Sequence, residues 1–193
     1  ARVVAGDQRA GEGLMASLKP FVYRKYIDFS AFESLRSMKE MISREVRRKG
    51  LENNIKLGSG GIREIEFVVQ AFQLIRGGRD RELQQRELLQ ILKELEELEL
   101  LPSRVVSELR DAYVFLRNLE HALQGMEDKQ TQILPEDALS CARVARIMGF
   151  DSWEDCLSAL DEHRSRVARH FADIVATEDQ DEADESSVDD GCY

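Results

Sequence analysis

Asn54-Ile-Lys-Leu-Gly-Ser-Gly-Gly-Ile-Arg-Glu-Ile-Glu-Phe67 is a glycine-rich segment that leads into a strongly apolar helix, and the rest of the sequence is organised around it. Ile55 and Leu57 alternate with polar residues or glycine, which is the period of a short strand or extended loop. We therefore expect an extended piece at residues 54–58, with Lys56 facing away from its apolar neighbours.

From Ile62 onward the apolar residues repeat with the period of an α-helix. They also fall on other faces, which predicts a helix that is buried on most of its sides. Gly77 and Gly78 mark its end, because glycine readily takes the left-handed conformation that closes many helices.

The start of this helix has the features of an anion-binding site. The three glycines around Ser59 allow another backbone or a ligand to come close, and they leave the first N–H groups of the helix pointing outward. Such an end attracts anions, and Lys56 and Arg63 flank it. The segment would then hold a phosphate or dock a carboxylate of a neighbouring domain. The simpler interpretation, which the pattern favours, is a helix capped by Ser59 without a ligand.

The spacing excludes two better-defined motifs. Glu64 and Glu66 follow a Gly-Ser turn, as two metal-binding carboxylates do in nucleotidyltransferases. Here the gap is too short, and on a helix the two side chains point about 200° apart. The lysine precedes the glycines, whereas a phosphate-binding loop places it after them, next to Ser or Thr. We therefore expect no metal site in this segment.

Several separated motifs resemble the bifunctional glutamine synthetase adenylyltransferase/adenylyl-removing enzymes of bacteria, in the order that this family has them. Residues 56–67 are similar to the family's linker motif, and the Arg63-Glu-Ile-Glu66 form resembles the first, adenylyl-removing half. The likeness covers about residues 1–176. The other similar segments are residues 1–7, 20–28, 41–48, 72–79 and 130–135.

The resemblance implies a large transferase of two halves, each a nucleotidyltransferase domain followed by a helical domain. The first half would remove AMP from a tyrosine of glutamine synthetase with phosphate, and the second would attach AMP from ATP. Both would use Mg²⁺ with ATP or ADP, under control of the PII signal protein and glutamine. Because the spaced Asp-x-Asp of the catalytic domain is missing here, the sequence corresponds to the helical domain alone.

In the intact enzyme we expect residues 54–67 to lie against the nucleotidyltransferase domain of the same polypeptide. Lys56 and Arg63 would hold phosphate or a carboxylate, while Glu64 and Glu66 would make opposed contacts. We predict no catalytic or metal-binding residue in this chain, which alone should bind no cofactor and catalyse nothing. The predicted contact residues are Lys56, Gly58, Gly60, Gly61, Arg63, Glu64 and Glu66.

Two other functions compete with this one. The first is a protein-interaction module for PII or glutamine synthetase with no role near the nucleotide. The second is a nucleic-acid binder that uses the basic cluster at residues 44–49. It ranks last, because basic side chains at a helix end complement the helix dipole and need no ligand. Contact of this cluster with an acidic surface of the catalytic domain or with substrate phosphate ranks between this purely structural role and nucleic-acid binding.

The charge of the chain is concentrated at its carboxyl end. The 193 residues carry a net charge of −10, and residues 177–193 contain eight acidic residues and no Lys or Arg. The other 176 residues therefore carry only −2, which is not the charge of a nucleic-acid-binding domain. We expect a helical domain at residues 1–176 and a disordered acidic linker at 177–193.

The sequence also indicates a cytoplasmic protein. No run of about 18 apolar residues exists to span a membrane, and the first residues lack the layout of a signal peptide. The three cysteines are widely spaced without a C-x-x-C pair, which indicates reduced thiols rather than zinc or disulfides. Cys141 and Cys156 fall in apolar helical positions, where a free cysteine acts as a small hydrophobe.

Apolar periodicity and capping residues predict an all-α bundle of about six or seven helices. The first follows the cap Asp7 and is interrupted or restarted at Pro20, and the second runs from the cap Ser30 to Gly50. We expect Cys156, Leu160 and Phe171 to face the core from the last helix. The remaining helices are predicted at residues 62–76, 88–98, 103–125, 136–148 and from 151 or 152 to about 174.

Histidine and acidic side chains on these helices are not spaced to share a metal ion. His163 and His170 are two turns apart, about 10 Å, and we expect both at the surface or half-buried. Glu120 and the adjacent His121 diverge by about 100°. In the helix at 136–148 the residues expected to face inward are Ala138, Leu139, Ala142, Ala145 and Met148.

Overall fold

The computed structural model describes residues 3–23, 50–51, 53–127 and 131–185, with five single residues between 37 and 48; the side chains of 127 and 175–185 are not included. This part of the chain is helical and contains no strand, which confirms the all-α prediction. In chain order the elements are α1 (Gln8–Val22), α3 (Ile62–Arg76), the 3-10 helix η1 (Arg81–Leu83), α4 (Leu88–Glu97), α5 (Ser103–Glu127), α6 (Ala138–Ile147) and α7 (Trp153–Glu185).

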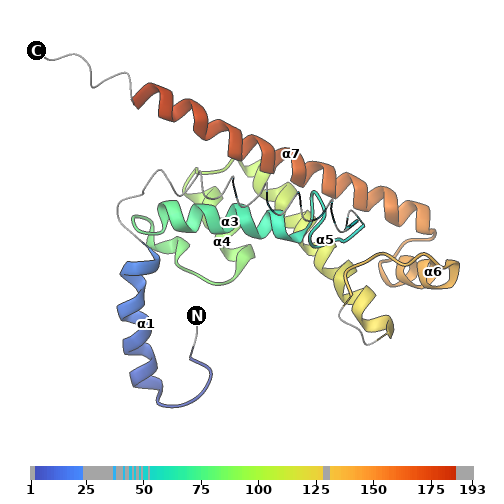
Figure 1. Ribbon diagram of the computed structural model, residues 1–193, viewed down its shortest axis with the longest axis horizontal. Helices are drawn as coiled ribbons and strands as arrows, with labels where there is room; N and C mark the ends of the chain where they lie inside the picture. The colour runs from blue at the N-terminus through green and yellow to red at the C-terminus, as the bar shows by residue number, and fades with distance from the viewer. Residues whose placement is uncertain are drawn as a thin grey trace, which may run out of the picture.

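The two longest of these helices, α5 and α7, pack along each other and organise the bundle (Figure 1). α3 packs against both of them, α4 packs against α3 and α5, and α6 lies beside the first turns of α7. One apolar core joins these helices, and it includes Ile65 of α3, Leu92 of α4, Leu116 of α5 and Phe171 of α7. Among the described helices none is long and apolar enough to cross a membrane.

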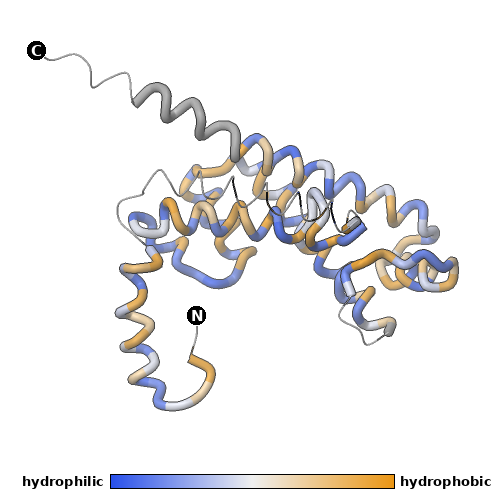
Figure 2. The backbone as a smooth tube through the Cα atoms, in the orientation of Figure 1, coloured by the Kyte–Doolittle hydropathy of each residue, from blue (hydrophilic) through white to orange (hydrophobic). Residues whose placement is uncertain are grey.

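α1 stands apart from the bundle. It projects from the end of the bundle where α3 ends, and none of its residues is buried (Figure 1). The ring of Tyr23, which follows α1, lies against Gly77 at the end of α3. Apolar residues nevertheless recur along α1 (Figure 2), and several of them are exposed.

Four predicted helix ends are confirmed by their capping geometry. The side chains of Asp7 and Ser152 accept hydrogen bonds from the backbone N–H three residues later, at 3.1 and 3.0 Å. Gly50 and Gly149 have φ angles of 62° and 83°. The N–H of the residue after each of them bonds to the carbonyl five residues back, at 2.9 Å, which closes the helix. The predicted cap Ser30 lies outside the described residues, as does part of the basic cluster at 44–49.

The predicted break at Pro20 and the predicted conformation at the end of α3 are wrong. α1 continues through Pro20, which lies in its last turn, where proline disrupts few of the backbone bonds of the helix. α3 ends at the expected place, but the C-cap Gly77 is right-handed, with φ of −63°. Glycine is needed there because a Cβ would lie 2.3 Å from the Gln73 carbonyl oxygen and 2.7 Å from the Tyr23 ring. α5 runs two residues past Gly125, the predicted end.

The extended piece predicted at residues 54–58 is reduced to one bridge, between Asn54 and Ile133. Ile55 is fully buried whereas Leu57 is exposed, so the two side chains do not share a face. The Asn54 side-chain oxygen accepts the N–H groups of Lys56 and Leu57 at 3.0 and 2.9 Å. Such bonds bend the backbone into a turn and end the strand.

The face that α6 buries agrees only in part with the predicted one. Ala145 is buried as predicted and Met148 packs against the core. Ala138, Leu139 and Ala142, which were also expected to face inward, are exposed, and Cys141 and Val144 are buried. α6 packs on α5 and α7 together, so its orientation is set by two helices that its own periodicity cannot identify. The inward residues predicted for α7, among them Cys156, Leu160 and Phe171, are confirmed.

The last helix is longer than predicted. α7 continues to Glu185, so residues 177–185 are helical although they belong to the segment predicted to be disordered. A helix whose first turns are already packed extends at the gain of one hydrogen bond per residue. Residues 186–193 lie outside the described residues.

Candidate functional site

The glycine-rich segment folds back onto the start of α3. The N–H groups of Ile62, Arg63 and Glu64, the first three of the helix, donate to the carbonyls of residues 55, 56 and 61 at 3.2, 3.0 and 3.1 Å. The prediction that these N–H groups point outward, on which the less favoured anion-binding interpretation rested, is wrong. A helix start whose donors are satisfied by its own loop offers little to a phosphate.

Glu64 takes the capping role that was predicted for Ser59. The N-cap residue is Gly61, which has no side chain to make a capping bond. Instead the Glu64 carboxylate accepts the N–H of Gly60 at 3.0 Å. A carboxylate in the first turn also complements the positive end of the helix dipole. Glu64 is therefore committed to the structure of the loop.

The glycines of the segment allow the loop to lie directly on α7. Gly60 has φ of 70°, and a Cβ on it would lie 2.6 Å from the Cα of Arg164 in α7 and closer still to its carbonyl oxygen. The Arg164 side chain reaches back and donates from Nε to the Ser59 carbonyl at 2.8 Å. A Cβ on Gly61 would lie 2.7–2.8 Å from three carbonyl oxygens of the loop itself. The close approach predicted for these glycines is therefore made by α7.

Lys56 connects the same loop to α5 through a buried carboxylate. Its Nζ lies 3.5 Å from Oε1 of Glu120, whose side chain is only 4% exposed. Arg117, one turn earlier on α5, donates to the other oxygen of Glu120 at 2.6 Å, and its guanidinium lies 5.8 Å from the centre of the Tyr113 ring. A carboxylate removed from water needs such partners to stay charged.

The remaining predicted contact residues are also used within the chain. Arg63 pairs with Glu66 at 3.3 Å on the exposed side of α3, and the N–H of Gly58 donates to the Asn54 carbonyl at 2.8 Å. The structure thus joins all seven residues to one loop and helix start, with Glu64 bonded to Gly60 and Glu66 paired with Arg63. Contact of any of them with another domain stays a prediction.

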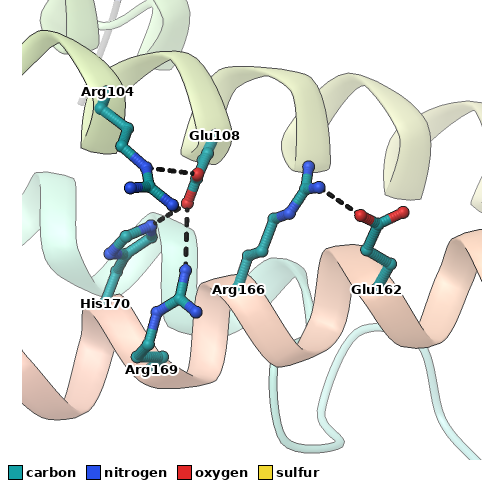
Figure 3. A network of polar contacts seen from close by, with 6 residues as sticks. All are labelled: Arg104, Glu108, Glu162, Arg166, Arg169 and His170. Carbon is teal, nitrogen blue, oxygen red and sulfur yellow. Dashed lines mark hydrogen bonds and ion pairs between the residues drawn. The ribbon is translucent and has the colours of Figure 1, made fainter.

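A second polar centre, which the sequence did not reveal, lies between α5 and α7 (Figure 3). Glu108 of α5 accepts from Arg104 at 2.9 Å and from Arg169 of α7 at 3.3 Å, and it lies 2.5 Å from Nε2 of His170. The hydrogen bonds from Arg104 and His170 lower the pKa of Glu108 to about 2. Arg166 and Glu162 pair beside this centre.

His170 is buried, which corrects the prediction that it lies at the surface or is half-buried. Of the contacts that Glu108 makes, only the one with Arg104 could be predicted from the sequence, because the two residues are four apart on one helix. The contact between His170 and Glu108 spans 62 residues of sequence, and no periodicity within either helix indicates it.

His163 is half-buried as predicted, between α7 and α5. Its ring lies 4.6 Å from that of Phe115, and its Nδ1 is buried without a hydrogen-bond partner in the part of the chain described here. Burial lowers the pKa of His163. The neutral ring therefore serves as an aromatic packing group in this seam.

The cysteines are placed as expected for core residues. Cys141 and Cys156 are both buried, and burial raises the pKa of each thiol. Cys141 also donates to the Pro135 carbonyl at 3.3 Å. Across residues 3–23, 53–127 and 131–174 we find no group of three or more potential metal ligands. The polar centres of the described chain connect helices to one another.

Comparison with known proteins gives a family-model match and several long relatives. Residues 36–175 match the family described as GlnD PII-uridylyltransferase. The chain is 64% identical over 176 residues to the bifunctional glutamine synthetase adenylyltransferase/adenylyl-removing enzyme of Hahella chejuensis, covering 91% of this chain and 18% of that protein. The enzyme of the same name from Pseudomonas aeruginosa is 57% identical over 187 residues, 97% of this chain and 19% of that protein. The chain thus spans about a fifth of the length of these relatives.

Gly60→Ala should destabilise the domain strongly. The new Cβ meets the backbone of Arg164, and the left-handed φ alone costs roughly 1–3 kcal/mol for a residue with a side chain. Gly125→Ala is the matched control, because Gly125 lies in α5 with open space around it. It should gain roughly 0.5–1 kcal/mol from helix propensity. Urea unfolding of the three proteins measures both effects, and equal midpoints would contradict the close approach.

Glu120→Gln should cost roughly 1.5–3 kcal/mol, because it removes the buried negative charge that pairs with Lys56 and Arg117 and turns one accepting oxygen into an N–H donor facing a cation. The control is Glu66→Gln, which breaks a pair whose arginine is half exposed. Exposed pairs contribute roughly 0–1 kcal/mol. Urea midpoints at low and at high salt compare the two variants. A similar small loss for both would show that Glu120 does not hold the loop to α5.

Glu108 should make stability depend on acid pH. Its pKa is about 2 in the folded chain and about 4.3 when unfolded, so its contribution is present above the unfolded value and is lost as the pH falls from about 4.5 to 2. The stability difference between the wild type and Glu108→Gln, from urea unfolding at several pH values, should shrink over that range. Arg104→Ala removes the main cause of the low Glu108 pKa and should weaken the pH dependence of stability. A stability difference between the wild type and Glu108→Gln that stays constant from pH 6 to 2 would refute the prediction.

Proposed function

We propose a function from one premise: the chain belongs to the family described as GlnD PII-uridylyltransferase, and it corresponds to a helical domain of the bifunctional glutamine synthetase adenylyltransferase/adenylyl-removing enzymes. Its role is to support and position the nucleotidyltransferase domain of the same polypeptide. We assign it to the first, adenylyl-removing half, on the Arg63-Glu-Ile-Glu66 form of its motif. By itself it catalyses nothing.

The observation that carries this proposal is the use of the motif inside the chain. Gly60 and Ser59 fix the loop to α7 through Arg164, and Lys56 fixes it to α5 through Glu120. The family's motif region therefore joins three helices into one rigid unit. A segment whose donors and charges are committed to its own fold suits a support for catalysis better than a source of reacting groups.

Mg²⁺ and ATP or ADP belong to the rest of the polypeptide in this proposal. Glu64 and Glu66 are the motif's carboxylates, and they do not fit a metal ion. Glu64 accepts from the Gly60 N–H while Glu66 faces Arg63, so the two do not converge on one point. The relatives are named for their action on glutamine synthetase. We propose the same substrate for the complete enzyme to which this chain belongs. Regulation by PII and a cytoplasmic location are part of the same proposal.

A chimera tests this role. The segment of the Hahella chejuensis enzyme that aligns with 176 residues of this chain is replaced by the corresponding residues of this chain. Phosphate-dependent release of AMP units from adenylylated glutamine synthetase is then measured. We expect activity close to that of the parent, no activity from this chain alone, and a loss of at least about tenfold when Gly60→Ala disturbs the loop. Gly125→Ala is the control that should keep activity.

Two outcomes would overturn the support role. AMP release by the isolated chain would make it a catalyst. Equal activity of the enzyme with and without this segment would make it an interaction module instead. Titration of the segment with glutamine synthetase and with PII would then identify its partner.

A further inference from the structure

α1 carries an apolar stripe that stays exposed in the described chain. Leu14, Leu18 and Val22 are 61%, 38% and 46% exposed. Spaced four residues apart, they fall within about 80° of one another around the helix. The opposite side of the helix is mostly polar, with Arg9, Glu12, Ala16 and Lys19. This is the pattern of a helix that rests one face on another surface.

α1 is also a poor helix on its own. It is 15 residues long and includes Pro20 and two glycines, of which Gly11 is packed by Val3 and Gly13 has open space around it. Isolated helices of this length are marginal in water even when rich in alanine, and glycine and proline lower helix stability further. None of its residues is buried by the bundle. A surface that covers the stripe would therefore stabilise this helix.

The relatives indicate where that surface lies. The Pseudomonas aeruginosa match covers 187 of the 193 residues, so at most six residues are unmatched, and α1, which begins at residue 8, lies within it. The family-model match begins at residue 36, after α1. α1 thus accompanies the bundle in the long enzymes but lies outside the matched domain. About four-fifths of each such polypeptide lies outside this segment and can supply the covering surface.

We infer that the stripe of Leu14, Leu18 and Val22 docks on an apolar surface of the nucleotidyltransferase domain in the same polypeptide. This rests on the proposed function and names the surface through which the support acts. The contact between Tyr23 and Gly77 holds the end of α1 beside the end of α3. A surface on the same chain is present at high effective concentration. Through α1, the position of the nucleotidyltransferase domain would be coupled to α3 and, through α3, to α7.

The full-length chimera described above tests the inference with two matched variants. Leu14→Asp places a charge in the stripe, and Ala16→Asp places the same charge on the opposite side of the same helix. Hydrogen exchange of residues 8–22 is the main measurement, because it does not require activity. We expect α1 to be protected in the chimera and in Ala16→Asp, and to exchange at least about tenfold faster in Leu14→Asp. AMP release should fall in Leu14→Asp alone.

The outcomes separate this inference from the proposed function. Unprotected α1 in the chimera, or equal exchange in the two variants, would overturn the docking surface even if the chimera is active. Protection lost only in Leu14→Asp would support it even if the chimera is inactive. If Leu14→Asp instead turns a dimer into a monomer by sedimentation, the stripe is covered by a second copy and the inference is wrong. Thermal unfolding of the bundle checks that both variants fold.

Discussion

The close approach of Gly60 to the backbone of α7 is the constraint on which the rest of the described structure depends. No side chain fits between the loop and Arg164, so the distance between the start of α3 and α7 is set by backbone contact alone. This distance lets the Arg164 side chain reach the Ser59 carbonyl. It also brings Phe67, in the second turn of α3, edge-on against Phe171 of α7 at 5.5 Å between ring centres. A steric limit on one residue thus fixes how two helices pack.

Two carboxylates on α5 complete this arrangement by electrostatics. Glu120 holds Lys56 of the loop, and Glu108 holds Arg169 and His170 of α7. Each is mostly removed from water and each has at least two basic partners, as burial of a charge requires. Such pairs add little net stability compared with apolar packing, but a misplaced partner leaves a buried charge uncompensated. They therefore select the observed positions of the loop and of α7 relative to α5.

These contacts change where the chain can meet a partner. Sequence reasoning placed the contact at the helix start of residues 54–67, because glycines and an open helix end suggest an anion. The structure satisfies those N–H groups with the loop's own carbonyls. The apolar face of α1, in contrast, has no buried residue. In the proposed function, contact with the catalytic domain is therefore assigned to that face and not to a charge at the glycine loop.

The sequence by itself determined the helices, most of their ends and the family. Capping at Asp7, Gly50, Gly149 and Ser152 depends on bonds within five residues, and the core face of α7 follows from periodicity along one helix. Only the tertiary structure decided the partners of Arg164 and His170, which are 105 and 62 residues away in sequence. It also decided which face α6 buries. The physical reason is that capping and periodicity are local properties of the chain, whereas close approach and charge compensation are set when helices distant in sequence pack together.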